Sequence, residues 1–553
     1  MSRDPSPARG RNPLTLAASA SVWIATLANW PLWRALRALP EMDSTRGWLF
    51  IVGFAGMVAA LTLALLAFAA WRRTIKPAIA LFLVSAALGA HFMGSYGIVI
   101  DPTMMTNVLQ TNPRETLDLL SLRLFASVLL LAGLPLLMLW WVPVQRLRLG
   151  AQLGRNAMAL IVSVVVLAAL VFALFADLSA TMRNHKSMRY LINPVNSFFA
   201  LGVLAFETQA RPSGPPQGIG TDVRMLPRTA GARPPLLVLV VGETARADHF
   251  ALNGYARPTN PELATLDVTS FREVTSCGTN TAASLPCMFS ALGRQGYEAR
   301  QRDQETLVDL AQHAGLAVLW LDNQAGCKGV CERVPNAYAH DVPAGTSPLP
   351  AALCADGDCL DDALLHGLDQ RLAALPAERR ARGVLLVLHQ MGSHGPAYYK
   401  RSPPEHKPFA PECSTNVLQQ CEHEALINAY DNSIAYTDHV LAATIAWLKR
   451  QTVTHDPAML YVSDHGESLG ENNLYLHGLP YALAPREQKH VPMIAWFAPQ
   501  TASAAALDLA CLAGRRDTAL SHDNLFHSVM GLLALLSAEY RAELDAFAPC
   551  RPG

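Results

Sequence analysis

The chain has 553 residues, too many for one ordinary domain, and 51% of them are hydrophobic while only 16% are charged. This composition is unusually apolar for a wholly soluble protein and predicts a membrane portion. The formal net charge is zero, so the charge of the whole chain gives no support for nucleic-acid binding, and we expect no nucleic-acid partner.

Apolar residues are concentrated near the start of the chain. Four segments contain no Asp, Glu, Lys or Arg and can each cross about 30 Å of hydrocarbon as a helix. They span residues 48–70, 77–100, 124–144 and 156–176. A fifth, weaker span at 14–36 is interrupted by Pro31 and Arg34. A cleaved signal peptide is the alternative there, but a signal peptide precedes soluble sequence, and here another span follows almost at once. We therefore expect an α-helical membrane domain of five transmembrane helices over residues 1–176.

Basic residues predict the orientation of these spans. Three flanking segments, which precede span one, join spans two and three, and join spans four and five, contain one acid, Asp4, and many basic residues. The basic residues are Arg3, Arg9, Arg11, Arg72, Arg73, Lys76, Arg146, Arg148 and Arg155. Because basic loops stay on the cytoplasmic side, we expect a multi-pass protein with a cytoplasmic N-terminus. Five crossings then place the chain beyond residue 177 on the far side of the membrane.

The cysteines give independent support for export. All ten lie in the second half of the chain, and most fall into short-range pairs. The pairs are Cys277/Cys287, Cys327/Cys331, Cys354/Cys359 and Cys413/Cys421, which leaves Cys511 and Cys550. An even number confined to the exported part predicts disulfides in an oxidising compartment, with a pairing suggested only by proximity. A structural zinc site built from the second and third pairs is the alternative, but no matching histidine spacing accompanies them.

The middle of the chain changes character twice. Residues 177–210 alternate apolar patches with basic residues, which is typical of amphipathic helices lying along a membrane interface. Residues 211–235 are rich in Pro and Gly and predict a linker. From residue 236 onward, the runs LLVLVV, LAVLWL, GVLLVL, AMLYV and MIAWF are separated by helix-length segments. Such runs predict buried parallel strands in an α/β domain over residues 236–553.

Polar residues follow four of these strands where each ends, which is where open α/β sheets build their sites. They are Glu243 and Thr244, Asp322 and Asn323, His389 with His394 shortly after it, and Asp464 with His465. Glu243, Asp464 and His465 offer donors suited to zinc, and three protein ligands leave the ion one open position. An Asp-His pair alone is weak support, because an Asp at a strand end often caps a helix. The metal prediction therefore depends on the convergence of several strand ends.

A hydroxyl nucleophile is expected in the segment SCGTNTAAS at residues 276–284. A hydroxyl at a helix start gains from the helix dipole and from a zinc ion that stabilises its alkoxide. A cluster of capping residues is the alternative interpretation. Spacing alone leaves Thr279, Thr281 and Ser284 as equal candidates.

Five longer segments resemble the lipid A phosphoethanolamine transferase family, which includes the mobile colistin-resistance enzymes. They are VVGETARADHFALNGYARPTNP, SCGTNTAASLPCMFS, CKGVC, GSHGPAYY and SDHGESLGENNLYLHGLPYA. The resemblance covers essentially the whole chain and implies an alkaline-phosphatase/sulfatase-like hydrolase fold. It implies a zinc-dependent enzyme of the bacterial inner membrane whose catalytic domain is periplasmic. The implied donor is phosphatidylethanolamine, and the acceptor is a phosphate group of lipid A, a component of lipopolysaccharide, or of an inner-core sugar.

The resemblance also assigns roles to single residues. Thr281 corresponds to the nucleophile, which takes phosphoethanolamine, releases diacylglycerol and forms a phospho-threonine intermediate. Glu243, Thr281, Asp464 and His465 correspond to the ligands of one primary Zn²⁺. Whether a second zinc ion binds is left open by the resemblance. His394, His477 and Lys328 match the substrate-side residues.

The positive charges of Lys328 and of protonated His394 and His477 suit a phosphodiester, because negative charge grows on its oxygens during transfer. His394 or His477 can also transfer a proton. A solvated surface histidine is the alternative for His477.

A loop between membrane spans completes the implied site. Asn107, Thr111 and Glu115 recur every four residues, which would align them on one helix face. The resemblance implies that they reach the donor headgroup, with Glu115 pairing with the ethanolamine ammonium. Structural capping is the alternative, since Pro113 can end the helix before Glu115. Ala325 departs from the family pattern, in which a serine is usual.

Several rival functions remain at this level. A type I sulfatase needs a Cys-x-Pro-x-Arg segment, whereas Cys287 is followed by Met-Phe-Ser. A glycerol-phosphate transferase and a non-catalytic scaffold fit the cysteine pattern and the intact ligand set less well. The acceptor stays open among lipid A, Kdo, heptose and periplasmic glucan. We expect a monomer, and we expect polymyxin resistance as a consequence of lowering the negative charge of the envelope.

Overall fold

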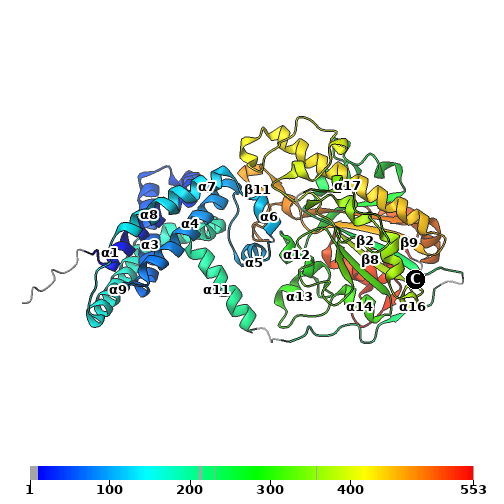
Figure 1. Ribbon diagram of the computed structural model, residues 1–553, viewed down its shortest axis with the longest axis horizontal. Coiled ribbons are helices and arrows are strands. Elements are labelled where there is room, and N and C mark those ends of the chain that lie inside the picture. The colour runs from blue at the N-terminus through cyan, green and yellow to red at the C-terminus, as the bar shows by residue number, and fades with distance from the viewer. Residues whose placement is uncertain (1–9, 112, 211–213, 229–230, 356–357, 552–553) are drawn as a thin grey trace, which may run out of the picture. The chain divides into compact units, whose positions relative to one another are not determined.

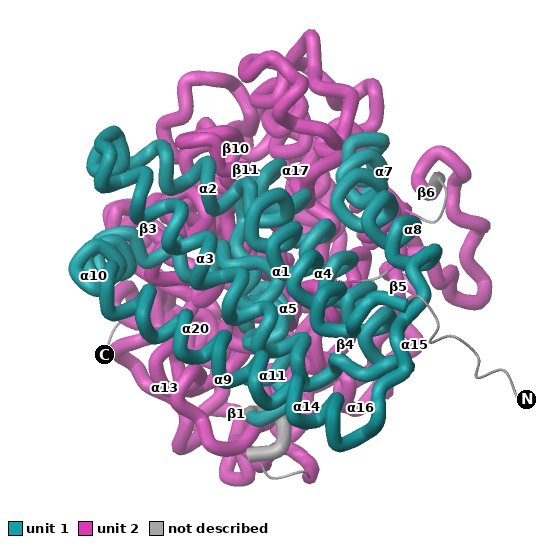
Figure 2. Tube along the Cα trace, turned by 90° about the vertical axis from the view of Figure 1, so that its left-hand side faces the viewer, with its two compact units in different colours: residues 1–105, 120–206 teal, residues 106–119, 207–553 magenta. Residues whose placement is uncertain are grey.

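The computed structural model describes residues 10–111, 113–210, 214–228, 231–355 and 358–551 (Figure 1). The chain divides into two compact units, one made of residues 1–105 and 120–206 and the other of residues 106–119 and 207–553 (Figure 2). The segment 106–119 thus belongs with the C-terminal unit, although it lies between membrane helices in the sequence.

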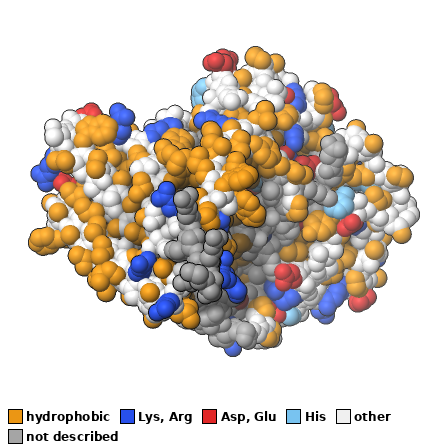
Figure 3. Space-filling model, turned by 60° about the vertical axis from the view of Figure 1, so that its left-hand side comes forward, with side chains coloured by type: hydrophobic (Ala, Val, Ile, Leu, Met, Phe, Trp, Pro, Cys, Tyr) orange, Lys and Arg blue, Asp and Glu red, His pale blue; other side chains and the backbone are white. Residues whose placement is uncertain are grey.

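Among the described residues of the N-terminal unit, four helices are long and apolar enough to cross a membrane. They are α3 (Thr45–Phe68), α4 (Ile75–Tyr96), the run Leu122–Trp141 and α9 (Leu149–Ala173). The third comprises α7 (Leu122–Val128), a π-helical turn and α8 (Leu134–Trp141). Large apolar side chains such as Trp140 and Phe172 are 79% and 87% exposed. Figure 3 shows many hydrophobic side chains on one face of the molecule. An exposed apolar surface of this kind suits contact with lipid.

The first predicted span is not one continuous helix. It forms α1 (Pro13–Thr26) and α2 (Trp30–Arg37), and α1 with 14 residues is only about 21 Å long, less than the thickness of a bilayer core. The break lies at Asn29, whose buried amide donates to the carbonyls of Ile24 and Asn193 at 2.9 and 2.6 Å. Beyond α9, the unit ends in α10 (Phe175–Asn184) and α11 (Val195–Ala210).

An eight-stranded sheet forms the centre of the C-terminal unit, in the order β13-β3-β12-β9-β2-β8-β4-β5. The bounds are β2 Pro235–Gly242, β3 Val268–Thr275, β4 Ala317–Asp322, β5 Asn336–Tyr338, β8 Val384–His389, β9 Asp456–Ser463, β12 His490–Phe497 and β13 Leu520–Ser521. Parallel pairing aligns Gly242 of β2 with Ser463 of β9. Glu243 and Asp464 therefore leave neighbouring strands at the same level.

One strand contradicts the expected parallel arrangement. β12, which contains the run MIAWF, lies antiparallel to both β9 and β3. Parallel neighbours need a crossover that returns to the same end of the sheet, whereas the chain from β9 to β12 contains only short strands and 3₁₀ turns. The sheet also contains β3, whose side chains are only partly buried and form no continuous apolar run.

Helices cover both faces of the sheet. Leu237, Leu239 and Val241 of β2 join one apolar core, which includes residues of α12 (Thr281–Met288), α14 (Leu307–His313) and α20 (Leu525–Leu532). The alternate residues of β2 join a second core with α17 (His423–Gln451). Both faces of the strand are buried, which explains its uninterrupted apolar sequence. Smaller helices are α13 (Gly293–Ala299), α15 (Leu368–Ala374), α16 (Ala377–Arg380), α18 (Pro499–Ala504) and α19 (Leu509–Gly514).

Disulfides and a short ladder complete this unit. The cysteines form five disulfides, Cys277–Cys287, Cys327–Cys331, Cys354–Cys359, Cys413–Cys421 and Cys511–Cys550. Four of these are the pairs suggested by proximity along the chain, and the fifth joins the two cysteines that those pairs left over. Part of the expected linker is also packed on the unit, because β1 (Arg224–Met225) pairs with β14 (Leu535–Leu536).

Candidate active site

Three buried side chains meet at the carboxyl ends of β2 and β9. Glu243, Asp464 and His465 are fully buried, and each contributes a ligand atom to a group whose atoms lie within 4.8 Å of one another. His465 Nε2 lies 3.3 Å from Glu243 Oε1 and 3.4 Å from Asp464 Oδ2. The sequence placed these residues at strand ends, and the register of β2 and β9 brings them together.

Thr281 faces this group from the first turn of α12. Asn280 caps the helix, since its side-chain oxygen accepts a hydrogen bond from Ala283 N at 3.0 Å. The Thr281 hydroxyl donates to Glu243 Oε2 at 3.1 Å and lies 3.5 Å from His465 Nε2. Its position at the helix N-terminus favours negative charge on the oxygen.

The other two candidate hydroxyls bind backbone instead. Thr279 donates to the carbonyl of Leu479 at 2.6 Å, and Ser284 donates to the carbonyl of Asp464. Of the three residues that spacing could not separate, only Thr281 points its hydroxyl at the carboxylate and imidazole group.

Neighbouring groups orient the candidate ligands. Thr244 Oγ1 and Gln324 Nε2 donate to the two oxygens of Glu243 at 2.7 and 2.9 Å. His465 Nδ1 lies 2.9 Å from the carbonyl of Gly466, so Nδ1 carries the proton and the lone pair of Nε2 faces the group. Such outer hydrogen bonds are typical of metal-binding histidines and carboxylates. Gln324 is a residue that sequence reasoning missed, although it follows β4 closely and the same strand-end rule could have found it.

The spacing of the four donor atoms fits a metal ion. Thr281 Oγ1 lies 3.3 Å from Glu243 Oε1 and 3.5 Å from His465 Nε2. His465 Nε2 in turn lies 3.3 Å from Glu243 Oε1 and 3.4 Å from Asp464 Oδ2. Ligands about 2.0–2.1 Å from a tetrahedral ion are about 3.3 Å apart. Among the described residues, Asp464 Oδ2 has no hydrogen-bond donor although it is buried. A cation would satisfy this oxygen.

The electrostatics lead to the same conclusion. Burial, followed by the charge of Glu243, raises the pKa of Asp464 to about 7. Burial would lower the pKa of His465, but the charge of Asp464 and the hydrogen bond and charge of Glu243 raise it to about 10. Two adjacent buried carboxylates are costly without compensating charge, and a divalent cation would supply it.

Two further histidines lie beside this group. The ring centroid of His477 is 4.3 Å from that of His465 and 5.8 Å from that of His394. His477 is only 8% exposed, so the surface-histidine alternative is wrong. Its Nδ1 lies 3.3 Å from Oε1 of the buried Glu467, another residue that sequence reasoning missed. Burial, followed by the charge of His465, lowers the pKa of His477 to about 3.

Lys328 contacts a different part of the unit. The Cys327–Cys331 disulfide closes its loop, and Lys328 Nζ donates to the carbonyls of Gln110 at 3.3 Å and Ala325 at 3.2 Å. These residues line a pocket with a volume of about 440 Å³. The structure thus brings Lys328 next to the segment 106–119, and its described hydrogen bonds do not involve Thr281 or the candidate ligands.

The expected helix face at Asn107, Thr111 and Glu115 is interrupted. The first residue lies in α5 (Pro102–Gln110), which ends before Thr111, and Pro113 begins α6 (Pro113–Asp118). Proline fits this first helical position because it lacks a backbone donor. Thr111 Oγ1 donates to the carbonyl of Asn107 at 2.8 Å. The side chain of Glu115 lies outside the described residues.

Asp118 attaches this segment to the rest of the C-terminal unit. Its two carboxylate oxygens accept hydrogen bonds from Lys400 Nζ at 2.5 Å and Arg401 Nη2 at 2.7 Å. Asn416 Nδ2 donates to the Asp118 carbonyl at 2.7 Å. Burial would raise the pKa of Asp118, but the hydrogen bond to Lys400 and the charges of both basic residues hold it below its ordinary value. Nothing in the sequence distinguished Asp118 from the other charged residues of its loop.

Comparisons with known proteins cover both units. A family model described as phosphoethanolamine transferase EptA/EptB matches residues 58–208, and the Sulfatase model matches residues 235–535. Phosphoethanolamine transferase EptA of Salmonella typhimurium is 40% identical over 474 residues, covering 85% of this chain and 84% of the relative. Phosphatidylethanolamine transferase Mcr-1 of Escherichia coli is 37% identical over 531 residues, covering 95% of each.

A solved structure extends the similarity to the whole fold. The integral membrane lipooligosaccharide phosphoethanolamine transferase A (EptA) of Neisseria meningitidis matches with a TM-score of 0.91 and 34% identity. The match covers 98% of this chain and 99% of that one. The helical membrane region and the sulfatase-like domain therefore occur together in a solved relative.

Proposed function

Because the chain belongs to the phosphoethanolamine transferase family, we propose that it modifies lipid A. The donor is phosphatidylethanolamine, and the acceptor is a phosphate group of lipid A. The observation that carries this function is the Thr281 hydroxyl set 3.1 Å from Glu243 and 3.5 Å from His465 at the start of α12. A hydroxyl held in this way suits covalent group transfer.

The reaction has two displacement steps. In the first, Thr281 Oγ forms a bond to the phosphorus of the donor, the bond to the diacylglycerol oxygen breaks, and that oxygen takes a proton. In the second, an oxygen of the acceptor phosphate forms the new bond to phosphorus, and the bond to Thr281 breaks. A phospho-threonine therefore links the two half-reactions.

The chain's own residues prepare the nucleophile. Glu243 accepts the hydrogen bond of Thr281 and so fixes the direction of its oxygen. A Zn²⁺ ion held by Glu243, Thr281, Asp464 and His465 would supply positive charge that favours the alkoxide and offsets the charge growing on the phosphate. One such ion accounts for the four donor atoms. We assign proton transfer to His394 and His477, because His477 lies beside His465 and His394 lies beside His477.

We assign donor binding to the segment 106–119 and its surroundings. Lys328 contacts this segment through Gln110 and offers a positive charge for the phosphate of the donor. Asn107 and Thr111 offer polar groups in the same segment, and Glu115 offers a negative charge for the ethanolamine ammonium. The disulfide around Lys328 supports this role because it restricts the loop that carries the charge.

The membrane arrangement completes the proposal. The chain is an inner-membrane protein with a domain boundary near residue 176, a connecting region to residue 235 and a periplasmic catalytic domain from residue 236. Helices α1 and α2 together form the fifth crossing, so the N-terminus is cytoplasmic. Five disulfides support a catalytic domain in an oxidising compartment. The working form is a monomer.

The direct test is the mass of lipid A. The protein is expressed in a polymyxin-sensitive Gram-negative host, beside Thr281→Ala, and lipid A is examined by mass spectrometry. We expect phosphoethanolamine on lipid A with the wild-type chain and not with the variant. Equal modification of lipid A by Thr281→Ala would contradict the assignment of Thr281 as the nucleophile. Modification of Kdo, heptose or periplasmic glucan instead would replace the acceptor, and an added glycerol phosphate would replace the transferred group.

A further inference from the structure

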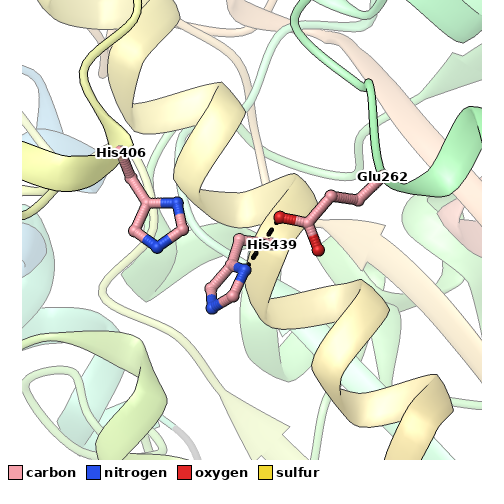
Figure 4. A group of neighbouring side chains, drawn as sticks. All are labelled: Glu262, His406 and His439. Atoms are coloured by element: carbon pink, nitrogen blue, oxygen red, sulfur yellow. Dashed lines mark hydrogen bonds and ion pairs between the residues drawn. The ribbon is translucent and has the colours of Figure 1, made fainter.

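A second group of metal-binding side chains lies outside the candidate active site. Glu262 precedes η6 (Leu263–Thr265), His406 ends η10 (Pro404–His406), and His439 lies within α17. Each offers one ligand atom, and the three atoms lie within 4.8 Å of one another. Glu262 Oε1 is 2.9 Å from His439 Nδ1, and Figure 4 shows the two imidazoles side by side with the carboxylate across from His439. Three separate segments thus converge on one point.

Buried contacts hold two of these segments together. The carboxylate of Asp438, which is buried, accepts hydrogen bonds from the backbone nitrogens of Glu262 at 2.8 Å and Leu263 at 3.2 Å. Asp438 is the neighbour of His439 on α17, so the backbone that carries Glu262 is fixed beside that helix. The approach of Glu262 to His439 is therefore built into the fold.

The third segment is held by ring contacts. The ring centroids of His406 and His439 are 4.1 Å apart, and the ring of Tyr436 lies 5.4 Å from His406 and 6.1 Å from His439. These contacts with Tyr436 hold the imidazoles of His406 and His439 next to each other. Both histidines are partly exposed to solvent, and the side chain of His439 is 29% exposed.

The local charge favours a cation. Asp362 Oδ2 lies 3.8 Å from His439 Nε2, so His439 has a carboxylate near each ring nitrogen. The carboxylates of Glu262 and Asp362 beside two imidazoles give the site a surplus of negative charge whenever the imidazoles are neutral, and a divalent ion would balance it.

We propose that Glu262, His406 and His439 bind a second transition-metal ion, separate from the one at Thr281. Two imidazoles and a carboxylate suit Zn²⁺, and also Ni²⁺ or Cu²⁺, rather than Ca²⁺ or Mg²⁺. In a tetrahedral site the ligand atoms would be about 3.3 Å apart, which is closer than the 4.8 Å limit here. Glu262 Oε1 is already 2.9 Å from His439 Nδ1, so the remaining approach would be made by His406, which is partly exposed.

Such an ion would have a structural effect. It would tie the loop that contains His406 to α17 and to the backbone near Glu262. The same loop begins just after Lys400 and Arg401, which bind Asp118 of the segment 106–119. Ion binding is expected to stabilise this part of the unit without taking part in group transfer.

Metal content tests the proposal directly. The full chain is purified in detergent, stripped of metal with a chelator and re-equilibrated with Zn²⁺. Its bound zinc is then measured by inductively coupled plasma mass spectrometry. The double variant His406→Ala/His439→Ala is expected to bind about one ion fewer per chain than the wild type. Glu262→Gln, which is nearly isosteric, is expected to bind this ion more weakly.

Two controls separate this site from the active site. His313→Ala removes a histidine that lies 2.9 Å from one carboxylate, Glu305, without a second imidazole, and its metal content is expected to equal that of the wild type. Asp464→Asn is expected to keep the second ion, seen as Co²⁺ absorption that the triple variant Asp464→Asn/His406→Ala/His439→Ala lacks. Equal metal content in the double variant and the wild type would overturn the proposal, whatever the activity of either protein.

Discussion

Thr281 differs from the hydroxyl residues around it in what its side chain contacts. Thr279 and Ser284 use their hydroxyls to bind carbonyls, whereas Thr281 faces Glu243 and His465. The sequence predicted that a hydroxyl in this segment would act, because its residue types suit that chemistry. It could not choose among them, since the choice depends on how α12 meets β2 and β9. Only the resemblance to a family made that selection before the structure.

The first prediction concerns the nucleophile. Thr281→Ala is expected to lower the rate of diacylglycerol release from phosphatidylethanolamine by about three orders of magnitude or more, because no oxygen remains to form the covalent intermediate. Thr281→Ser keeps an oxygen at the helix start and is expected to retain measurable release. The measurement is a single-turnover assay with labelled donor. Equal loss in both variants would contradict a role for the hydroxyl itself.

The second prediction concerns Gln324, which follows β4 closely. Its amide donates to Glu243 at 2.9 Å and leaves that carboxylate oriented toward Thr281. Gln324→Ala is expected to lower zinc affinity by about 10–100-fold, as other losses of outer hydrogen bonds do. Competition with a chromogenic chelator measures this affinity. Gln301→Ala, at an exposed glutamine, is the matched control, and equal affinities of the two variants would contradict the role.

At the scale of elements, the apolar runs predicted the central strands well because their side chains are buried on both faces. The direction of β12 was not predictable in this way, since burial does not encode direction. The interrupted helix at 102–118 was only partly foreseen. Pro113 indicated a boundary, but the assignment of the segment to the C-terminal unit depends on the long-range ion pairs of Asp118.

The third prediction follows from those ion pairs. Asp118→Asn is expected to raise the KM for phosphatidylethanolamine about tenfold and to change kcat less, since a hydrogen bond to a charged group contributes about 1.5–3 kcal/mol. Asp118→Glu is expected to restore part of the affinity. Asp358→Asn is the control, because Asp358 lies 3.9 Å from the same Arg401 but belongs to β7 (Asp358–Cys359). Equal KM values for Asp118→Asn and Asp358→Asn would argue against a positioning role.

The fourth prediction is the pH dependence of this attachment. The pKa of Asp118 is held below its ordinary value when Lys400 and Arg401 contact it. The Asp118 carboxyl therefore binds a proton less readily when the segment is attached than when it is free. Its stabilising effect is therefore complete above the ordinary carboxyl pKa of about 3.9 and is lost as the pH falls through the lowered value. KM should rise at acid pH in the wild type and stay flat in Asp118→Asn. A parallel rise in both proteins would assign the effect to another group.

At the scale of the whole molecule, the number of membrane crossings depends on residues 14–36, which form α1 and α2. Helices α3, α4, α7–α8 and α9 are long enough to cross by themselves, and the basic loop at Arg72, Arg73 and Lys76 predicts their direction. The sequence could predict these four from length and composition alone. It indicated an interruption of the span 14–36 at Pro31 and Arg34, but it could not place the break between α1 and α2 at Asn29, which is hydrogen-bonded to the distant Asn193.

The last prediction tests whether α1 and α2 cross the membrane together. Because the later helices fix the side of every loop after Thr45, the first region changes only the side of the N-terminus. If it crosses, the N-terminus is cytoplasmic and a fluorescent protein fused there, of a kind that matures only in the cytoplasm, gives bright cells. If it lies along one surface, the N-terminus is periplasmic and the same fusion stays dark. A fusion after α9 is the dark control, and lipid A modification by each fusion shows that the protein is folded.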